Sequence, residues 1–243
     1  MIKIENIDVF GWEAAIRGMR NPMNSWDKSD SKYKYWCSCL NQNEEPHYCE
    51  NCTYDACNPY TGEPDFVIGD NDLKLMKQLS KAGNDHGKFL RMINVTFDVT
   101  CHHAWWAEFD TYKVGTVRNS CSKMHKIHVK KFTYDDFAHE GIDDVSREFG
   151  EVKGSVLGYI NTLEWLRNKF NETQEKRFWR ALIEMLPMGY NIKATIQLNY
   201  QVLKTIYFTR RNHKLDEWRE FCKWCETLPY FKDICIQEGD AND

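Results

Sequence analysis

Strict alternation of apolar and polar residues marks the segment Ile93-Asn94-Val95-Thr96-Phe97-Asp98-Val99-Thr100. Successive side chains of a strand point to opposite faces, so this pattern predicts a strand with one buried face. A second alternation, from Ile192 to Leu198, predicts either another half-buried strand or the approach to a helix over Asn199 to Arg210. We therefore expect a small, mainly antiparallel sheet.

Helical periodicity accounts for most of the remaining chain. Apolar residues recur at helical spacing in five further segments, residues 10–20, 102–109, 155–170, 174–186 and 215–227. A helix carrying Leu73, Met76 and Leu79 is expected between a cap at Asn71 or Asp72 and a stop at Gly83. The expected fold class is α+β, with helices packed around the sheet in a single domain over residues 1–243.

The composition excludes several classes of protein. The 243 residues are 42% hydrophobic and 14% aromatic, which is enough to bury a core and excludes a disordered chain. A net charge of −4 argues against a dedicated nucleic-acid-binding protein, whose domain is usually strongly basic. The most apolar uncharged run, Val99 to Ala107, is too short for a membrane span. Because no secretory signal is evident at the N-terminus, we expect a cytoplasmic protein.

Five of the ten cysteines lie in a polar segment, residues 21–64, which we interpret as an insertion. Thiols stay reduced in the cytoplasm, so closely spaced cysteine pairs there favour a metal site. Four thiolates in two short-spaced pairs can surround zinc tetrahedrally. The candidate ligands are Cys37, Cys39, Cys49 and Cys52, with Cys57 and His47 as alternatives. The competing interpretation is a polar surface loop with free thiols.

Two further cysteines and two adjacent tryptophans favour packing roles. Cys222 and Cys225 lie on the apolar face of the last predicted helix, so we expect them to point into the core. The isolated cysteines are Cys101, Cys121 and Cys235. Adjacent Trp105 and Trp106 are expected to pack, although stacking on nucleic-acid bases is an alternative use for them.

Residues 113–131 combine basic side chains with hydroxyls, a thiol and Gly115. Local positive charge beside hydroxyl donors is what a phosphate needs, although a solvated basic edge has the same composition. The segment is therefore a candidate anion site within an acidic protein.

The order of motifs along the chain resembles the flavin-dependent thymidylate synthases, ThyX, and especially their divergent phage-type members. The resemblance begins at Gly11-Trp12-Glu13-Ala14-Ala15-Ile16-Arg17 and resumes at Ala82-Gly83-Asn84-Asp85-His86. It continues from Phe97-Asp98-Val99 to His125, and returns at Leu186-Pro187, Asn199-Tyr200-Gln201, Arg210-Arg211-Asn212-His213 and Trp218. Residues 21–64 and about 130–170 lie outside it.

The resemblance implies an enzyme that transfers a one-carbon unit from methylenetetrahydrofolate to dUMP, or to a related pyrimidine deoxynucleotide. FAD would carry the hydride, and NADPH would regenerate the reduced flavin. It also implies a homotetramer, and the host cytoplasm as its location if the chain is phage-encoded.

The family's Arg-His-Arg signature falls on Thr111-Tyr112-Lys113 in this chain, and the serine that follows it falls on Cys121 or Ser122. Lys123 stands at the position of a phosphate-binding arginine, while another expected arginine is replaced by Ile183, one turn from Arg180. The resemblance implies substrate contacts from Glu108, Ser120, Cys121, Ser122, Lys123, Arg180 and Arg210. It implies cofactor contacts from His86, Thr111, Tyr112, Lys113, Asn119, Asn199 and His213, and no catalytic nucleophile.

Two functional hypotheses follow from these replacements. In one, the substituted residues preserve the anion sites, and the protein is a thymidylate synthase-like enzyme. In the other, the protein keeps the fold as a nucleotide-binding or structural protein without synthase activity. Taken alone, His86 could also cap a helix, and Cys121 could be either a substrate contact or a buried thiol.

Overall fold

The computed structural model describes residues 1–34, 36–37, 47–48 and 65–236. The chain forms two compact units. The first, the sheet unit, contains Met1–Val9 and Asn94–Leu228, and the second, the insertion unit, contains Phe10–Ile93 and Pro229–Asp243. The expectation of one domain over residues 1–243 stays a prediction.

The sheet unit contains a four-stranded sheet in the order β1-β6-β8-β7. Its strands are β1 (Lys3–Phe10), β6 (Asn94–His102), β7 (Val117–Ser120) and β8 (Asn191–Asn199). β6 and β8 are antiparallel, with Asn94 opposite Asn199 and His102 opposite Asn191, and β7 continues the sheet antiparallel to β8. Both predicted strands are confirmed, and β8 leads directly into the helix that was expected over Asn199 to Arg210.

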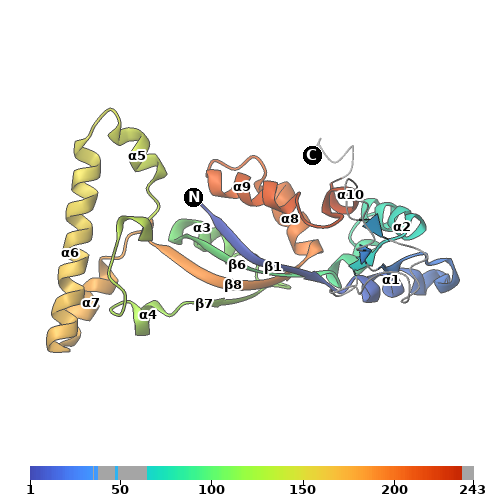
Figure 1. The fold of residues 1–243 in the computed structure, drawn as a ribbon, viewed down its shortest axis with the longest axis horizontal. Coiled ribbons are helices and arrows are strands. Elements are labelled where there is room, and N and C mark those ends of the chain that lie inside the picture. The colour runs from blue at the N-terminus through green and yellow to red at the C-terminus, as the bar shows by residue number, and fades with distance from the viewer. Residues whose placement is uncertain (35, 38–46, 49–64, 237–243) are drawn as a thin grey trace. The chain divides into compact units, whose positions relative to one another are not determined.

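One face of this sheet carries the core of the unit. The alternate residues of β6 and β8 are buried, from Val95 to Cys101 and from Ile192 to Leu198. Phe97 stacks at a tilt on Trp224, with ring centroids 4.6 Å apart. Three helices contribute to this core, α3 (His103–Phe109), α8 (Tyr200–Arg210) and α9 (Asp216–Cys225), and Figure 1 shows α8 and α9 on one side of the sheet.

The packing roles predicted for Trp105, Trp106, Cys222 and Cys225 are confirmed. Trp105 and Trp106 are fully buried and meet edge to face, so they offer no stacking surface to nucleic-acid bases. Cys101, Cys222 and Cys225 are buried in the sheet unit, and Cys235 is buried in the insertion unit. Cys121 is exposed, so the alternative of a buried thiol at that position is wrong.

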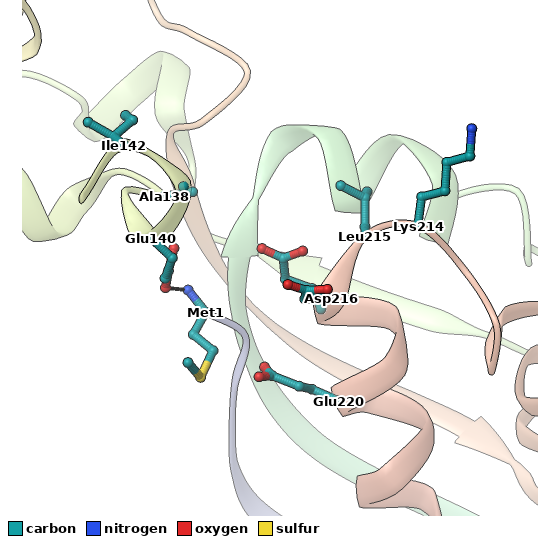
Figure 2. A pocket seen from close by; sticks show the side chains of 10 residues that line it. Met1, Ala138, Glu140, Ile142, Lys214, Leu215, Asp216 and Glu220 are labelled. Atoms are coloured by element: carbon teal, nitrogen blue, oxygen red, sulfur yellow. Dashed lines mark ion pairs between the residues drawn. The ribbon is translucent and has the colours of Figure 1, made fainter. Parts of the chain in front are cut away.

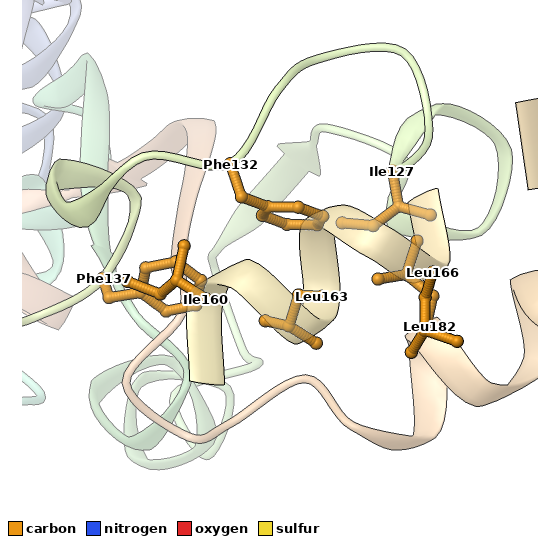
Figure 3. Packing of buried hydrophobic residues seen from close by; sticks show 7 residues of the cluster. All are labelled: Ile127, Phe132, Phe137, Ile160, Leu163, Leu166 and Leu182. Atoms are coloured by element: carbon orange, nitrogen blue, oxygen red, sulfur yellow. The ribbon is translucent and has the colours of Figure 1, made fainter. Parts of the chain in front are cut away.

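A second core lies where two long helices pack together. These are α6 (Glu151–Thr173) and α7 (Lys176–Glu184). Three shorter helices precede them in the chain, α4 (Lys123–Lys126), η4 (Tyr134–Asp136) and α5 (Glu140–Ser146). Figure 3 shows the buried residues of this core, Ile127, Phe132, Phe137, Ile160, Leu163, Leu166 and Leu182. Both long helices were predicted, although α6 begins at Glu151 and α7 ends at Glu184.

The insertion unit is built on helices α1 (Trp12–Arg20), α2 (Asp70–Lys81) and α10 (Phe231–Cys235). Short helical turns lie at η1 (Asn21–Met23), η2 (Trp26–Lys28) and η3 (Gly87–Arg91). Two small antiparallel sheets pair β2 (Lys32–Lys34) with β5 (Asp65–Val67), and β3 (Trp36–Cys37) with β4 (His47–Tyr48).

The predicted cap of α2 is wrong, because the helix begins at Asp70 after Gly69. Asp72 is instead fully buried and pairs with Arg20, whose Nε donates to Asp72 Oδ1 over 2.6 Å. Asp72 Oδ2 accepts hydrogen bonds from the hydroxyls of Ser29 and Ser31. The carboxylate therefore joins α1, α2 and the segment that leads into the insertion.

The predicted metal site cannot be placed. Cys39, Cys49, Cys52 and Cys57 lie outside the described residues, as do the side chains of Cys37 and His47, whose backbones are paired in β3 and β4. In the part of the chain that the structure describes, no three His, Cys, Asp or Glu side chains are grouped to hold a metal ion. None of the described helices is both long enough and apolar enough to cross a membrane.

Candidate functional site

Four residues predicted for substrate or cofactor meet around the carboxylate of Glu108, near the end of α3. Arg210 Nη1 donates to Glu108 Oε2 over 2.6 Å, and Arg210 Nε donates to the Tyr112 hydroxyl over 2.8 Å. His213 Nε2 lies 3.3 Å from the same Glu108 oxygen. We call Glu108, Tyr112, Arg210, His213 and Trp218 the Glu108 cluster.

The cluster is ordered by hydrogen bonds as well as by charge. His213 Nδ1 accepts the backbone N–H of Leu215, so Nε2 carries the proton and faces Glu108. Trp218 Nε1 also donates to Glu108 Oε2, over 2.9 Å, and the Arg210 guanidinium lies 4.9 Å from the centre of the Trp218 ring. The carboxylate thus neutralises the arginine and fixes its orientation.

A cavity of about 200 Å³ lies beside the start of α3, and Lys123 lines it. The Lys123 Nζ is 2.7 Å from His103 Nε2. The other lining residues are Met124, Ile183, Leu186, Pro187 and Met188. Lys123 and Ile183, the two positions at which the resemblance expects arginines, therefore line the same cavity.

Burial and nearby positive charge act on both basic groups of this cavity. Burial, the Lys123 charge and the Arg118 charge lower the pKa of His103. Burial and Arg118 likewise lower the pKa of Lys123. Arg118 is itself held by Asp110, with its Nη1 2.6 Å and 2.7 Å from the two carboxylate oxygens, and it lies over the Trp106 ring. The cavity therefore favours a neutral imidazole beside one ammonium group.

The remaining residues predicted for substrate are spread over the surface. Arg180 is 72% exposed on α7 and pairs with Glu184, outside the lining of the cavity. Ser120 and Cys121 are exposed at the end of β7, and Ser122 caps α4 by accepting the backbone N–H of His125. Arg180 is thus not brought together with Lys123.

The remaining residues predicted for the cofactor fall into three places. Thr111 and Lys113 are exposed between α3 and β7, and Asn119 is exposed within β7. Asn199 caps α8, because its Oδ1 accepts the backbone N–H of Val202. His86 is exposed in the insertion unit, at the N-cap of η3, and its side chain forms no capping hydrogen bond with that helix. The capping role considered for His86 is therefore wrong.

Two residues of these sites were not assigned from the sequence. Trp218 and His103 both lie within the stretches of the resemblance, which gives neither of them a role. His102 and His103 are adjacent in the sequence, but their side chains have different surroundings in the structure. His102 is buried, accepts the backbone N–H of Trp105 and pairs with Glu217 over 3.1 Å, whereas His103 lines the cavity.

A larger cavity of the sheet unit, about 460 Å³, has the opposite charge (Figure 2). Glu140, Asp216, Glu217 and Glu220 line it, and the amino group of Met1 forms an ion pair with Glu140. Such a cavity repels a phosphate, and none of the residues predicted for substrate or cofactor lines it. The cavity beside His103 is the better place for an anion.

Solved structures provide the comparison that decides the fold. One structure of ThyX from Helicobacter pylori, complexed with FAD and dUMP, superposes with a TM-score of 0.61 over 96% of this chain and 98% of that chain. The chain has the ThyX fold. A second structure of Helicobacter pylori ThyX with FAD and dUMP gives a TM-score of 0.58 over 97% and 98% of the two chains.

The sequence has diverged far from these ThyX structures, with identities of 13% and 14%. No protein-family model matches the sequence, and no curated protein matches it either. The expectation of an α+β fold of the ThyX type is confirmed, whereas the roles of the individual residues stay predictions.

Proposed function

We propose that the protein is a flavin-dependent thymidylate synthase-like enzyme, which transfers a one-carbon unit from methylenetetrahydrofolate to dUMP or a related pyrimidine deoxynucleotide. The observation that carries the proposal is the ThyX fold over 96% of the chain, shared with a protein solved with FAD and dUMP. The basic cavity at Lys123 supports it, because the resemblance expects a phosphate-binding residue at that position.

The residues proposed for FAD suit a flavin nucleotide in their chemistry. No carboxylate among the described residues pairs with Lys113, so its ammonium group is available to a phosphate. Asn119 offers an exposed amide. Gly115 lies beside the amide of Asn199, another residue proposed for FAD, because a Cβ at Gly115 would lie 3.0 Å from Asn199 Nδ2. When bound, FAD would supply the hydride, and these residues would bind and orient it.

The Glu108 cluster would orient the nucleotide rather than act as a nucleophile. Glu108 fixes Arg210 and His213 in place, which lowers the entropy lost when a substrate is positioned beside them. The proposed assembly is a homotetramer, with NADPH as the source of electrons.

The alternative function is a nucleotide-binding protein of ThyX fold without synthase activity. The observation that favours it is the ion pair of Arg210 with Glu108, because this carboxylate already neutralises a cation proposed for substrate. The alternative predicts nucleotide binding without FAD and without turnover.

The visible absorption spectrum separates the two functions. We expect flavin bands in the purified protein, or saturable uptake of FAD on titration, and formation of dTMP from dUMP with methylenetetrahydrofolate and NADPH. Protein that takes up no FAD and forms no dTMP refutes the enzyme. Lys113→Ala should weaken FAD uptake more than Lys176→Ala, which removes an exposed lysine from a distant helix.

Three further measurements address the untested expectations. Thermal unfolding with dUMP, dCMP and dTMP identifies the preferred nucleotide, because a ligand of the folded state raises the midpoint. Light scattering gives the mass of the assembly and tests the homotetramer. Metal analysis of protein purified without chelator tests for zinc bound by the cysteines of residues 37–57.

A further inference from the structure

The cavity beside α3 contains two basic side chains that touch each other. His103 and Lys123 are the polar members of its lining, and the remaining five lining residues are apolar. At 2.7 Å, the Lys123 ammonium donates to His103 Nε2, so this nitrogen is unprotonated in the structure. The pair therefore carries one positive charge.

No carboxylate among the described residues forms an ion pair with either basic group. Asp110 forms an ion pair with Arg118 instead. Apolar walls strengthen electrostatic attraction within such a cavity, because they exclude water. Two adjacent nitrogens without an acidic partner form a site for an anion.

We propose that His103 and Lys123 together bind the phosphate monoester of the nucleotide, and that His103 takes up a proton when the phosphate binds. The identity of the nucleotide rests on the proposed function, while the anion site rests on the cavity. His103 is thus a substrate-binding residue that the resemblance does not assign.

The charges around His103 explain why the proton would arrive with the ligand. Lys123, Arg118 and His102 disfavour a second positive charge on the imidazole, from α4, β7 and β6 respectively. Tyr190 lies 6.4 Å from the His103 ring, and burial raises its pKa to about 12, so it stays neutral. A phosphate monoester brings about two negative charges at neutral pH, which reverses the balance and favours imidazolium.

The volume of the cavity limits how much of the nucleotide it can enclose. Pockets that bury a drug-sized ligand span roughly 300–1,000 Å³, and this one has about 200 Å³. The cavity suits a phosphate with part of its sugar, so the base would lie outside it. Binding should therefore depend on the phosphate more than on the base.

Calorimetric titration with dUMP and with deoxyuridine tests the proposal. Repeating each titration in buffers of different ionisation enthalpy gives the number of protons taken up on binding. The titrations are run at about pH 7.5, because the phosphate of dUMP is then mostly dianionic. We expect proton uptake with dUMP and none with deoxyuridine. His103→Gln should abolish the uptake and weaken dUMP about tenfold or more, as for a lost hydrogen bond to a charged group.

The matched control is His125→Gln, which removes an exposed histidine of α4 and should change neither quantity. Ile183→Arg in the His103→Gln background should restore affinity without restoring proton uptake, because Ile183 lines the cavity and arginine keeps its charge. No gain from this arginine would overturn the location of the phosphate.

The experiments distinguish a failure of the proposed flavin-dependent function from a failure of the anion site. Wild-type protein that binds dUMP without proton uptake, or a His103→Gln variant that matches wild type, overturns the role of His103 even if FAD is bound. If dUMP does not bind, the same titrations use inorganic phosphate. Proton-coupled phosphate binding then supports the site, and absence of binding overturns it, while FAD uptake reports separately on the proposed function.

Discussion

Replacing Asp72 by asparagine should destabilise the insertion unit by about 3–5 kcal/mol, as expected when one partner of a buried ion pair is removed. Asp72 is fully buried and Arg20 is 4% exposed. Besides Arg20, the carboxylate accepts four hydrogen bonds, from the Ser29 and Ser31 hydroxyls and from the backbone N–H groups of Asp30 and Ser31. The amide of Asp72→Asn keeps one acceptor oxygen, so in either orientation it leaves Arg20 or the four other donors without an acceptor.

Urea unfolding followed by far-ultraviolet circular dichroism measures the loss. With a slope of about 2 kcal/mol per molar urea, the midpoint should fall by roughly 1.5–2.5 M. Asp233→Asn is the control, because it breaks the exposed Lys77–Asp233 pair of the same unit and should cost less than about 1 kcal/mol. Equal losses in the two variants would refute the role assigned to the buried carboxylate.

Acid should act on wild-type protein in the same direction as this substitution. Burial favours the protonated carboxyl, but the hydrogen bonds from Ser31, Ser29 and Arg20 outweigh it and lower the pKa of Asp72. A lowered pKa stabilises the folded state above the unfolded pKa, near 4, and this stabilisation is lost as pH falls through the folded pKa. Asp72→Asn should lack this part of the acid dependence, and an unchanged dependence would contradict it.

Three other predictions concern the sheet unit. Glu108→Gln should lower its stability by about 1–3 kcal/mol and weaken binding of dUMP, measured by thermal unfolding, because it releases the arginine that the carboxylate fixes in place. Tighter dUMP binding would contradict this. Leu163→Ala should cost about 2–5 kcal/mol in urea unfolding, whereas Leu157→Ala, at 42% exposure on the same helix, should cost far less. Iodoacetamide should label Cys121 in the folded protein and Cys101 only after unfolding, as peptide mapping would show, because burial raises the pKa of Cys101 to about 12.

Periodicity predicted the elements that have one buried face. Residues 93–100 and 192–198 alternate because β6 and β8 share a core on one side. β1 was missed because its sequence, Lys3 to Phe10, alternates poorly, and most of its side chains are exposed or half-buried at an edge of the sheet. The alternation of apolar and polar residues reflects burial of one face of a strand. An edge strand without a buried face therefore shows little alternation in its sequence.

The candidate sites could be predicted only in part, because they depend on contacts between distant residues. The pair of Glu108 with Arg210 joins positions 102 residues apart, which no spacing rule connects. Sequence alone could not show which of His102 and His103 faces the cavity, since the boundary between β6 and α3 falls between them. The exposure of Cys121 likewise depends on β7 being an edge strand.

The short ladder of β2 and β5 makes the Cys-rich segment separable from the rest of the insertion unit. Lys34 lies opposite Asp65 in the ladder, and the Tyr33 and Phe66 rings meet 5.0 Å apart. The chain therefore enters and leaves the Cys-rich segment at neighbouring backbone positions. A two-residue Asn-Gly turn could close these strands, because it matches their separation and twist. Residues 35–64 could therefore be exchanged as a cassette, with or without a metal, without changing the β2–β5 ladder that brackets them.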